Sequence, residues 1–313
     1  MTGISDLYTD LTGWIFEHAL QPLLYALGLM DWAEDAYAWL DFALFGLLGI
    51  VVAWALCRPL EAWRPVEPLA DRGAVRTDML YTFLSRLGLL PLLAFVLLAS
   101  AQAAWEGWLT EAGLLPPTLE EMLPPLRDHP VAAFAAYVVI LDFAEYWRHR
   151  AQHTFRWWWA LHAIHHAQRQ MTFWTDDRNH VLDDVLAAVW FGVIALLIGV
   201  PPGQFPVIVL ILRLAESLSH ANVRLDYGRV GERLLVSPRF HRQHHAPLSA
   251  GAHGQNYAVL LPVWDWAFGT ANFRRGVFPP TGTPEEPESL ASGGWLRQQA
   301  VGLRRMVGAI AGR

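Results

Sequence analysis

The chain has 313 residues and a formal net charge of −6; 54% of its residues are hydrophobic and only 17% are charged. Soluble domains usually carry about 25% charged residues, so this deficit indicates that a lipid bilayer forms part of the protein's solvent. The negative net charge argues against a nucleic-acid partner. The single cysteine, Cys57, cannot form an internal disulfide, and it argues neither for an oxidising compartment nor for a cysteine-based metal site.

Apolar segments along the chain predict a helical bundle in a membrane. In chain order they are residues 11–30, 38–57, 78–101, 131–147, 185–200 and 205–219. Glu17 and His18 interrupt the first segment, which leaves an interfacial helix and a membrane span both open. The last two segments are short and are joined by "PPGQ", which favours a helical hairpin. We therefore expect an all-α, polytopic integral membrane protein with about four to six membrane helices.

The charges of the connecting loops predict how this bundle is oriented. Loop 58–77 carries four arginines, whereas loop 102–130 carries one arginine and several acids. Because loops rich in arginine stay in the cytoplasm, we expect the first loop inside and the second outside. Segment 131–147 then runs inward, and the hairpin starts and ends on the same side. The sequence thus predicts an inner-membrane protein whose later histidines face the cytoplasm.

Three short motifs, "HRAQH", "HAIHH" and "HRQHH", contain eight of the 13 histidines. These histidines are His149, His153, His162, His165, His166, His241, His244 and His245. On a helix, positions i, i+3 and i+4 share one face. Neutral imidazole suits iron, zinc and copper. Eight imidazoles exceed what one ion of ordinary coordination needs, so the motifs predict a histidine-rich cap that holds two metal ions.

Two further histidines are candidates for the same site. His220, in "SLSHANVR", ends the predicted hairpin at the same depth, and we expect it to be an additional ligand. His180, in "DDRNHVLDD", is balanced between a ligand, a supporting residue and an ordinary interfacial residue. We expect His18, His129 and His253 to take no part in metal binding.

Acidic and amide side chains are the natural partners of metal-bound imidazoles, which usually donate their second N–H to a carboxylate or carbonyl. Asp142 and Glu145 lie on the helical face of His149, so we expect them to orient ligands. An ion pair with Arg148 or Arg150 is the alternative. Further candidates are Asp176, Asp177, Asp183, Asp184, Asn222, Asp226, Asn256 and Asp265.

The chain divides into three predicted regions. Residues 1–130 contain the N-terminal membrane helices and loops, and residues 131–275 contain the histidine domain. Residues 276–313 read as a loose polar tail that ends in a short amphipathic helix suited to anionic lipid. Within the histidine domain, "FRWWWALH" at 155–162 is interpreted as an interfacial aromatic belt.

Together with "SHANV" and "QNYAVLLPVWDWAFGT", the histidine motifs resemble the fatty acid hydroxylase/sterol desaturase superfamily over roughly residues 135–270. The resemblance implies a membrane di-iron oxygenase that uses O₂ to oxidise a C–H bond of a lipid. It assigns the eight motif histidines, and His220 with them, as iron ligands. It also implies that electrons come from a separate donor, of the ferredoxin or cytochrome b5 type with its reductase.

The chain departs from the family pattern at two places. Arg224 stands where some members have a second histidine after the one matching His220, and "NHVLDD" at His180 lacks the proline and glutamate of a His-Pro-Leu-Glu element. Both departures leave the substrate open among sterols, fatty acyl chains, carotenoids and membrane lipids. Hydroxylation and desaturation also remain open.

A membrane metal transporter or metal-binding protein is the main alternative function. A transporter needs ionisable residues along a path near the bilayer midplane, whereas the motifs here gather at one surface. A haem electron carrier with two axial histidines needs single histidines on facing helices, rather than clusters of three.

Overall fold

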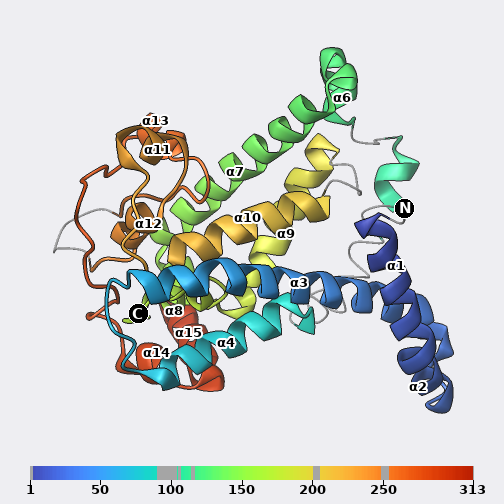
Figure 1. Ribbon diagram of the computed structural model, residues 1–313, viewed down its shortest axis with the longest axis horizontal. Coiled ribbons are helices and arrows are strands. Elements are labelled where there is room, and N and C mark those ends of the chain that lie inside the picture. Colours follow the sequence, from blue (N-terminus) through green and yellow to red (C-terminus); the bar gives the residue numbers. More distant parts are fainter. Residues whose placement is uncertain are drawn as a thin grey trace.

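The computed structural model describes residues 3–89, 104, 107–113, 117–199, 205–247 and 254–312. Every regular element in this part of the chain is a helix, as the sequence predicts. The long helices run alongside one another, and their ends converge on a group of short helices that we call the cap (Figure 1).

Two described helices are long and apolar enough to cross a bilayer. Helix α3 (Ala33–Trp63) belongs to the segment Met30–Trp63, in which an 18-residue stretch has a mean hydropathy of 2.2. Helix α7 (Pro130–Thr154) contains an 18-residue stretch with a mean hydropathy of 1.3. The predicted spans 38–57 and 131–147 lie inside these two helices. The total number of spans and the cytoplasmic orientation stay predictions.

The N-terminal segment 11–30 is helical but irregular. The chain forms α1 (Ile4–Ile15), the π-helical turn η1 (Phe16–Leu20), α2 (Gln21–Ala26) and the 3₁₀ turn η2 (Met30–Trp32) before α3 begins. The π-helical turn contains Glu17 and His18, the two residues that interrupt the apolar pattern.

The predicted span 78–101 begins inside α4 (Arg72–Arg86), while residues 90–103 lie outside the described part of the chain. The Asp71 side chain caps α4 by accepting two backbone N–H groups of its first turn. Asp78 and Arg86 are buried and bind polar partners far along the chain, so this helix packs on protein through a polar face.

The predicted hairpin consists of α9 (Val181–Ile198) and α10 (Phe205–His220). Gly199 ends α9 with a φ of +58°, and a Cβ there would lie 2.8 Å from the carbonyl oxygen of Pro117. Only glycine fits such a left-handed position at this close approach. The apolar side chains of Tyr137 and Ile208 belong to the cluster that packs α7 against the hairpin.

The remaining described helices are short, apart from the 16-residue α15. They are α6 (Leu119–Met122), η3 (Pro124–Asp128), α8 (Arg156–His166), η4 (Phe173–Thr175), α11 (Gly228–Leu234), α12 (Pro238–His244), α13 (Val263–Ala267), α14 (Glu288–Ser292) and α15 (Trp295–Ile310). The first two precede α7 at its far end, and the others form the cap (Figure 1).

The C-terminal region is packed into the cap, which corrects the expectation of a loose tail. Helix α15 lies against α8, where Trp295 and Val301 contact a buried cluster that includes Ile164. The Gln298 side chain is fully buried and accepts a hydrogen bond of 2.8 Å from the Tyr81 hydroxyl. The amphipathic pattern of α15 therefore reflects packing on protein along one face.

The interpretation of residues 155–162 as an aromatic belt is also corrected. Trp158 is buried, and its indole N–H donates to the Asp183 carboxylate at 2.7 Å. The indole of Trp159 donates to Glu286 at 2.8 Å. Both rings are held by acids from distant segments, which a local aromatic pattern does not reveal.

Candidate metal centre

Nine histidines gather at the cap end of the bundle in two groups. The first histidine group contains His149, His153, His162, His166 and His244; the second contains His165, His220, His241 and His245. Within each group the ligand nitrogens, one per residue, all lie within 4.8 Å of one another. The structure thus brings together all nine histidines that the sequence proposes as ligands.

Four helices supply these side chains: the ends of α7 and α10, and the short helices α8 and α12, which meet in the cap (Figure 1). Helix α12 starts at a defined point because the Ser237 hydroxyl accepts the backbone N–H of Phe240 and Pro238 occupies the first turn. This start fixes the register with which its three histidines face the site.

The two three-histidine motifs divide in the same way between the groups. In "HAIHH", His162 and His166 join the first group, and His165 joins the second. In "HRQHH", His241 and His245 join the second group, and His244 joins the first. Each motif therefore contributes an i, i+4 pair to one group and its third histidine to the other, so that the motifs bridge two adjacent sites.

In the second group the imidazole Nε2 atoms point at one another. The Nε2 atoms of His220 and His165 are 3.1 Å apart, and those of His241 and His220 are 2.9 Å apart. His245 Nε2 lies 3.1 Å from that of His241. Imidazole nitrogens bound at about 2.0–2.1 Å to a single metal ion lie about 3 Å from each other. The spacing therefore fits four ligands of one ion.

In the first group the inward nitrogens are buried without any protein partner. The Nε2 atoms of His149, His166 and His244 make no hydrogen bond in the described part of the chain. Buried polar atoms without partners are rare in folded proteins because each costs free energy. A metal ion would satisfy them, so this donor set also fits a metal.

The outward nitrogens of three of these histidines are held by backbone carbonyl groups. The bonds run from His149 Nδ1 to Tyr257 O (2.7 Å), from His244 Nδ1 to Gln255 O (2.8 Å) and from His220 Nδ1 to Glu216 O (2.8 Å). Because a carbonyl only accepts, each Nδ1 carries the hydrogen, and Nε2 keeps its lone pair for a metal.

Burial keeps the cap imidazoles neutral. Desolvation and the neighbouring imidazoles lower the pKa of His165, His166, His241 and His245 well below the usual value. Desolvation also lowers the pKa of His244 to about 3. At neutral pH these side chains are therefore uncharged, which is the form that binds metal.

Asp183 is the carboxylate closest to the first group. It accepts two hydrogen bonds from Gln152, at 2.7 and 2.9 Å, and one from the Trp158 indole. Its Oδ2 lies 3.4 Å from His162 Nδ1. The carboxylate thus faces His162, where it is placed to orient the ring, and it ties α9 to α7 and α8.

Replacing Asp183 with asparagine should weaken metal binding by about 10- to 100-fold, the usual effect of losing a residue that orients a ligand. The amide would turn N–H groups toward donors on Gln152 and Trp158. Metal titration of the purified variant measures this. Asp184→Asn is the matched control, because the Asp184 side chain forms no hydrogen bond or ion pair with any described residue. Equal metal affinities of the two variants would refute the orienting role.

Asp142 and Glu145 do not contact an imidazole in the described structure, contrary to the orienting role predicted for them. Asp142 accepts the backbone N–H groups of Leu260 and Leu261, at 3.0 Å each, and the Trp264 indole. Glu145 forms an ion pair of 2.5 Å with Arg148, which was the alternative prediction. Backbone carbonyls hold His149, His220 and His244 instead, and Asp183 is the carboxylate that faces His162.

The segment 255–272 is held in place by Asp142, Asp265 and Asn256. Asp265 accepts the backbone N–H groups of Tyr257 and Ala258, at 2.8 Å each. Asn256, at a φ of +58°, donates to the carbonyl oxygen of Phe240 on α12. These residues do not contact the imidazoles themselves. They position the carbonyl groups of Tyr257 and Gln255, which accept hydrogen bonds from His149 and His244.

Asn222 and Glu61 anchor the chain around the second group. Asn222 Oδ1 accepts the backbone N–H groups of Val66 and Glu67, at 3.0 and 3.2 Å. The buried Glu61 carboxylate accepts the backbone N–H groups of Phe173 and Asn222, each at 3.0 Å. Sequence reasoning missed Glu61, because nothing near it in the sequence marks its two distant partners.

His180 lies outside both histidine groups and acts as the N-cap of α9. Its Nδ1 accepts the backbone N–H of Leu182 at 3.0 Å, and its Nε2 donates to the carbonyl of Gln299 on α15 at 2.9 Å. Both ring nitrogens are engaged, so the supporting role is the one that the structure favours. His18 and His129 also lie outside the groups, and His253 lies outside the described residues.

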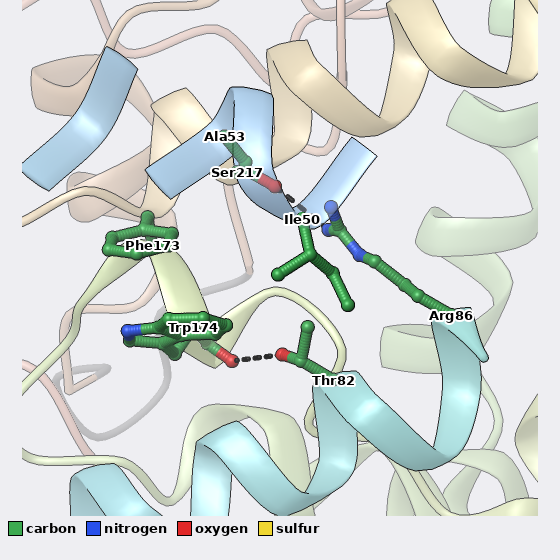
Figure 2. A pocket seen from close by; sticks show the side chains of 7 residues that line it. All are labelled: Ile50, Ala53, Thr82, Arg86, Phe173, Trp174 and Ser217. Carbon is green, nitrogen blue, oxygen red and sulfur yellow. Dashed lines mark hydrogen bonds between the residues drawn. The ribbon is translucent and has the colours of Figure 1, made fainter. Parts of the chain in front are cut away.

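A narrow hollow lies beside the second group (Figure 2). Its walls are Ile50, Ala53, Thr82, Arg86, Phe173, Trp174 and Ser217. Arg86 donates to Asp176 and Asp177 at 2.6 Å each, and Asp176 Oδ1 lies 3.8 Å from His220 Nδ1. The hollow leaves no room for a water molecule, whereas ligand pockets usually measure about 300–1,000 Å³. The hollow is therefore a gap within the polar support of His220 and is too small for a lipid.

Comparison with known proteins matches residues 134–270 to the fatty acid hydroxylase family model. Human alkylglycerol monooxygenase is 32% identical over 143 residues, 46% of this chain and 31% of that protein. An ornithine lipid hydroxylase of Rhizobium tropici is 29% identical, over 42% of this chain and 40% of its own length. The Delta(7)-sterol-C5(6)-desaturase of Nicotiana tabacum is 29% identical, over 44% of this chain and 48% of its own length.

The alignments thus cover less than half the length of each of these relatives. No solved structure matches the chain. All nine grouped histidines lie within the matched residues, and so do the segment 255–265 and Asp183.

Proposed function

Because residues 134–270 place this chain in the fatty acid hydroxylase/sterol desaturase superfamily, we propose that it is a membrane-bound di-iron oxygenase. It would use O₂ and external electrons to hydroxylate or desaturate a C–H bond of a lipid. The observation that carries the proposal is the pair of adjacent histidine groups, with five and four imidazoles, each of which fits one metal ion.

The residues that would hold the metals follow from the geometry. His149, His153, His162, His166 and His244 would bind one ion, and His165, His220, His241 and His245 the other. Nitrogen ligands suit several first-row metals, and family membership supports iron among them. When bound, the iron pair supplies the activation of O₂ that an unreactive C–H bond requires.

The chain itself orients the ligands and limits access of water. Backbone carbonyl groups hold the imidazoles of His149, His220 and His244, Asp183 lies beside His162, and eight of the nine histidines are buried. The Tyr257 ring lies 5.2 Å from the His153 ring and 5.7 Å from the His244 ring, so it closes one side of the first group. This enclosure would limit side reactions with water, so that the bound lipid is the group that is oxidised.

The substrate is proposed to be a lipid that reaches the site from the bilayer. The names of the relatives, an alkylglycerol monooxygenase, an ornithine lipid hydroxylase and a sterol desaturase, all denote lipids. The long apolar helices α3 and α7 lead to the histidine groups. The predicted inner-membrane location and cytoplasmic site belong to the same proposal, and a separate electron donor would supply the reducing equivalents.

Lipid mass spectrometry tests the function. Extracts from cells with and without the gene should differ by a lipid that gains one oxygen atom, for hydroxylation, or loses two hydrogen atoms, for desaturation. Expression of the parent protein, but not of His244→Ala, should restore the modified lipid. Identical lipid extracts under aeration and iron sufficiency would contradict an oxygenase, and metal flux into proteoliposomes would favour a transporter.

A further inference from the structure

A basic hollow lies on the outer side of the cap, away from the residues discussed so far. It measures about 210 Å³ and is lined by Gly228, Arg229, Glu232, Arg233, Phe273 and Arg275. Helix α11 supplies most of this lining, and in Figure 1 it lies at the edge of the cap beyond α12. We call this surface the basic hollow.

The charge of the basic hollow is positive although the whole chain carries −6. Arg229 and Arg233 are exposed, and within the described residues neither guanidinium has a hydrogen bond or ion pair. Arg275 is 48% exposed and lies 3.1 Å from Asp226. The only acid in the lining, Glu232, is buried and paired with the Arg239 guanidinium. The hollow is thus a local basic surface on an acidic protein.

The floor of the basic hollow connects directly to the second histidine group. Phe273 packs on Phe240, with ring centroids 5.5 Å apart. Phe240 precedes the candidate ligand His241 in α12, and Arg239 on the same helix joins Glu232 to the carbonyl oxygen of Arg274. Only the side chains of Phe273 and Phe240 would then separate a protein bound at the hollow from the candidate ligand His241.

We propose that the basic hollow is the docking surface for an acidic one-electron carrier protein. The inference rests on the proposed function, because an oxygenase needs electrons from outside. Hydroxylation consumes one O₂, two electrons and two protons for each C–H bond oxidised, and it yields one alcohol and one water. Each docking event would oxidise one reduced carrier and deliver one electron to the metal pair, so two events complete one turnover.

Helix α11 also favours a protein over a lipid headgroup as the occupant. Val230 and Leu234, which are 72% and 62% exposed, lie beside the arginines on the next face of the helix. An apolar patch next to arginines is typical of protein interfaces. The aromatic contact with α12 gives such a partner a route for electrons, which a headgroup does not need.

Charge reversal tests the docking surface. We expect Arg229→Glu/Arg233→Glu to lower the second-order rate constant of reduction about tenfold or more at low ionic strength, with a weaker salt dependence, because rim charges steer association. The iron-loaded protein would be mixed with a reduced acidic [2Fe–2S] ferredoxin or a soluble cytochrome b5 domain, and the carrier's own absorbance followed. Arg297→Glu/Arg304→Glu on α15 is the matched control.

A small neutral reductant, photoreduced 5-deazariboflavin, separates docking from the function itself. It should reduce the parent and both variants equally. If it reduces none of them in a metal-dependent way, the proposed function fails. Docking alone is overturned if the control variant loses as much rate as the α11 variant, or if neither carrier reduces the parent. It is also overturned if the α11 variant loses bound anionic phospholipid while its reduction rate stays unchanged.

Discussion

Replacing His244 with alanine is expected to reduce lipid oxidation to below about a thousandth of the parent activity and to release the metal of the first group. His244 brings an Nε2 atom into that group, and its Nδ1 is fixed by the carbonyl of Gln255. His241→Ala should have the same effect through the second group, since the proposed function would need both metal ions. Metal analysis and product assay of purified variants measure both effects.

The control for these variants is His129→Ala. His129 precedes α7 and lies outside both histidine groups, so its loss should change neither metal content nor turnover. The parent should carry about two metal ions per chain, and each ligand variant about one or fewer. Full activity of either His244→Ala or His241→Ala would contradict the assignment of that histidine as a ligand.

The second large effect is expected on stability. The guanidinium of Arg178 is fully buried, 2.5 Å from Asp78, and it also donates to the carbonyl oxygens of Ile164 and Leu290. Arg178→Met would leave the buried Asp78 carboxylate without its cation, which costs about 3–5 kcal/mol of unfolding free energy. The bonds to Ile164 and Leu290 join α8 to α14, so the loss should also loosen the helix that carries the "HAIHH" motif.

The matched control for Arg178 is Arg169, which forms an ion pair with Glu288 at the surface. The Arg169 side chain is 56% exposed and the Glu288 side chain is 63% exposed. Such surface pairs contribute about 0–1 kcal/mol, so Arg169→Met should barely change thermal unfolding. Unfolding curves of the two variants in the same detergent provide the comparison. Equal unfolding temperatures for both variants would show that the buried pair does not support the cap.

The histidines of the two groups can be predicted from the sequence, because helix geometry places i, i+3 and i+4 residues on adjoining faces. The division of each motif between two groups needs the structure. This division arises because α8 and α12 bring their motifs together with the ends of α7 and α10. These helices are far apart in the chain, so their packing leaves no signal in the local sequence. The i, i+4 pairs His162/His166 and His241/His245 show the rule that a sequence reader can apply elsewhere.

The supporting residues were harder to predict, for a physical reason. Spacing along α7 suggested Asp142 and Glu145, but a carboxylate's partner is decided by what packs opposite it. Asp142 faces the segment 260–264. The carboxylate that faces His162 is Asp183, which lies on the separate helix α9. Backbone carbonyls such as that of Tyr257 carry no residue-type signal at all. The helical fold and the hairpin were predictable, because apolar length alone determines them.

Metal content with an optical spectrum tests the central claim most directly. Protein purified from iron-sufficient cells should contain about two iron ions per chain and show no haem Soret band, because the two histidine groups offer nitrogen ligands to two separate ions. Iron should fall to about one ion or fewer in His244→Ala and in His241→Ala. A parent protein with one ion or none per chain, or one with a haem spectrum, would contradict the dinuclear iron site.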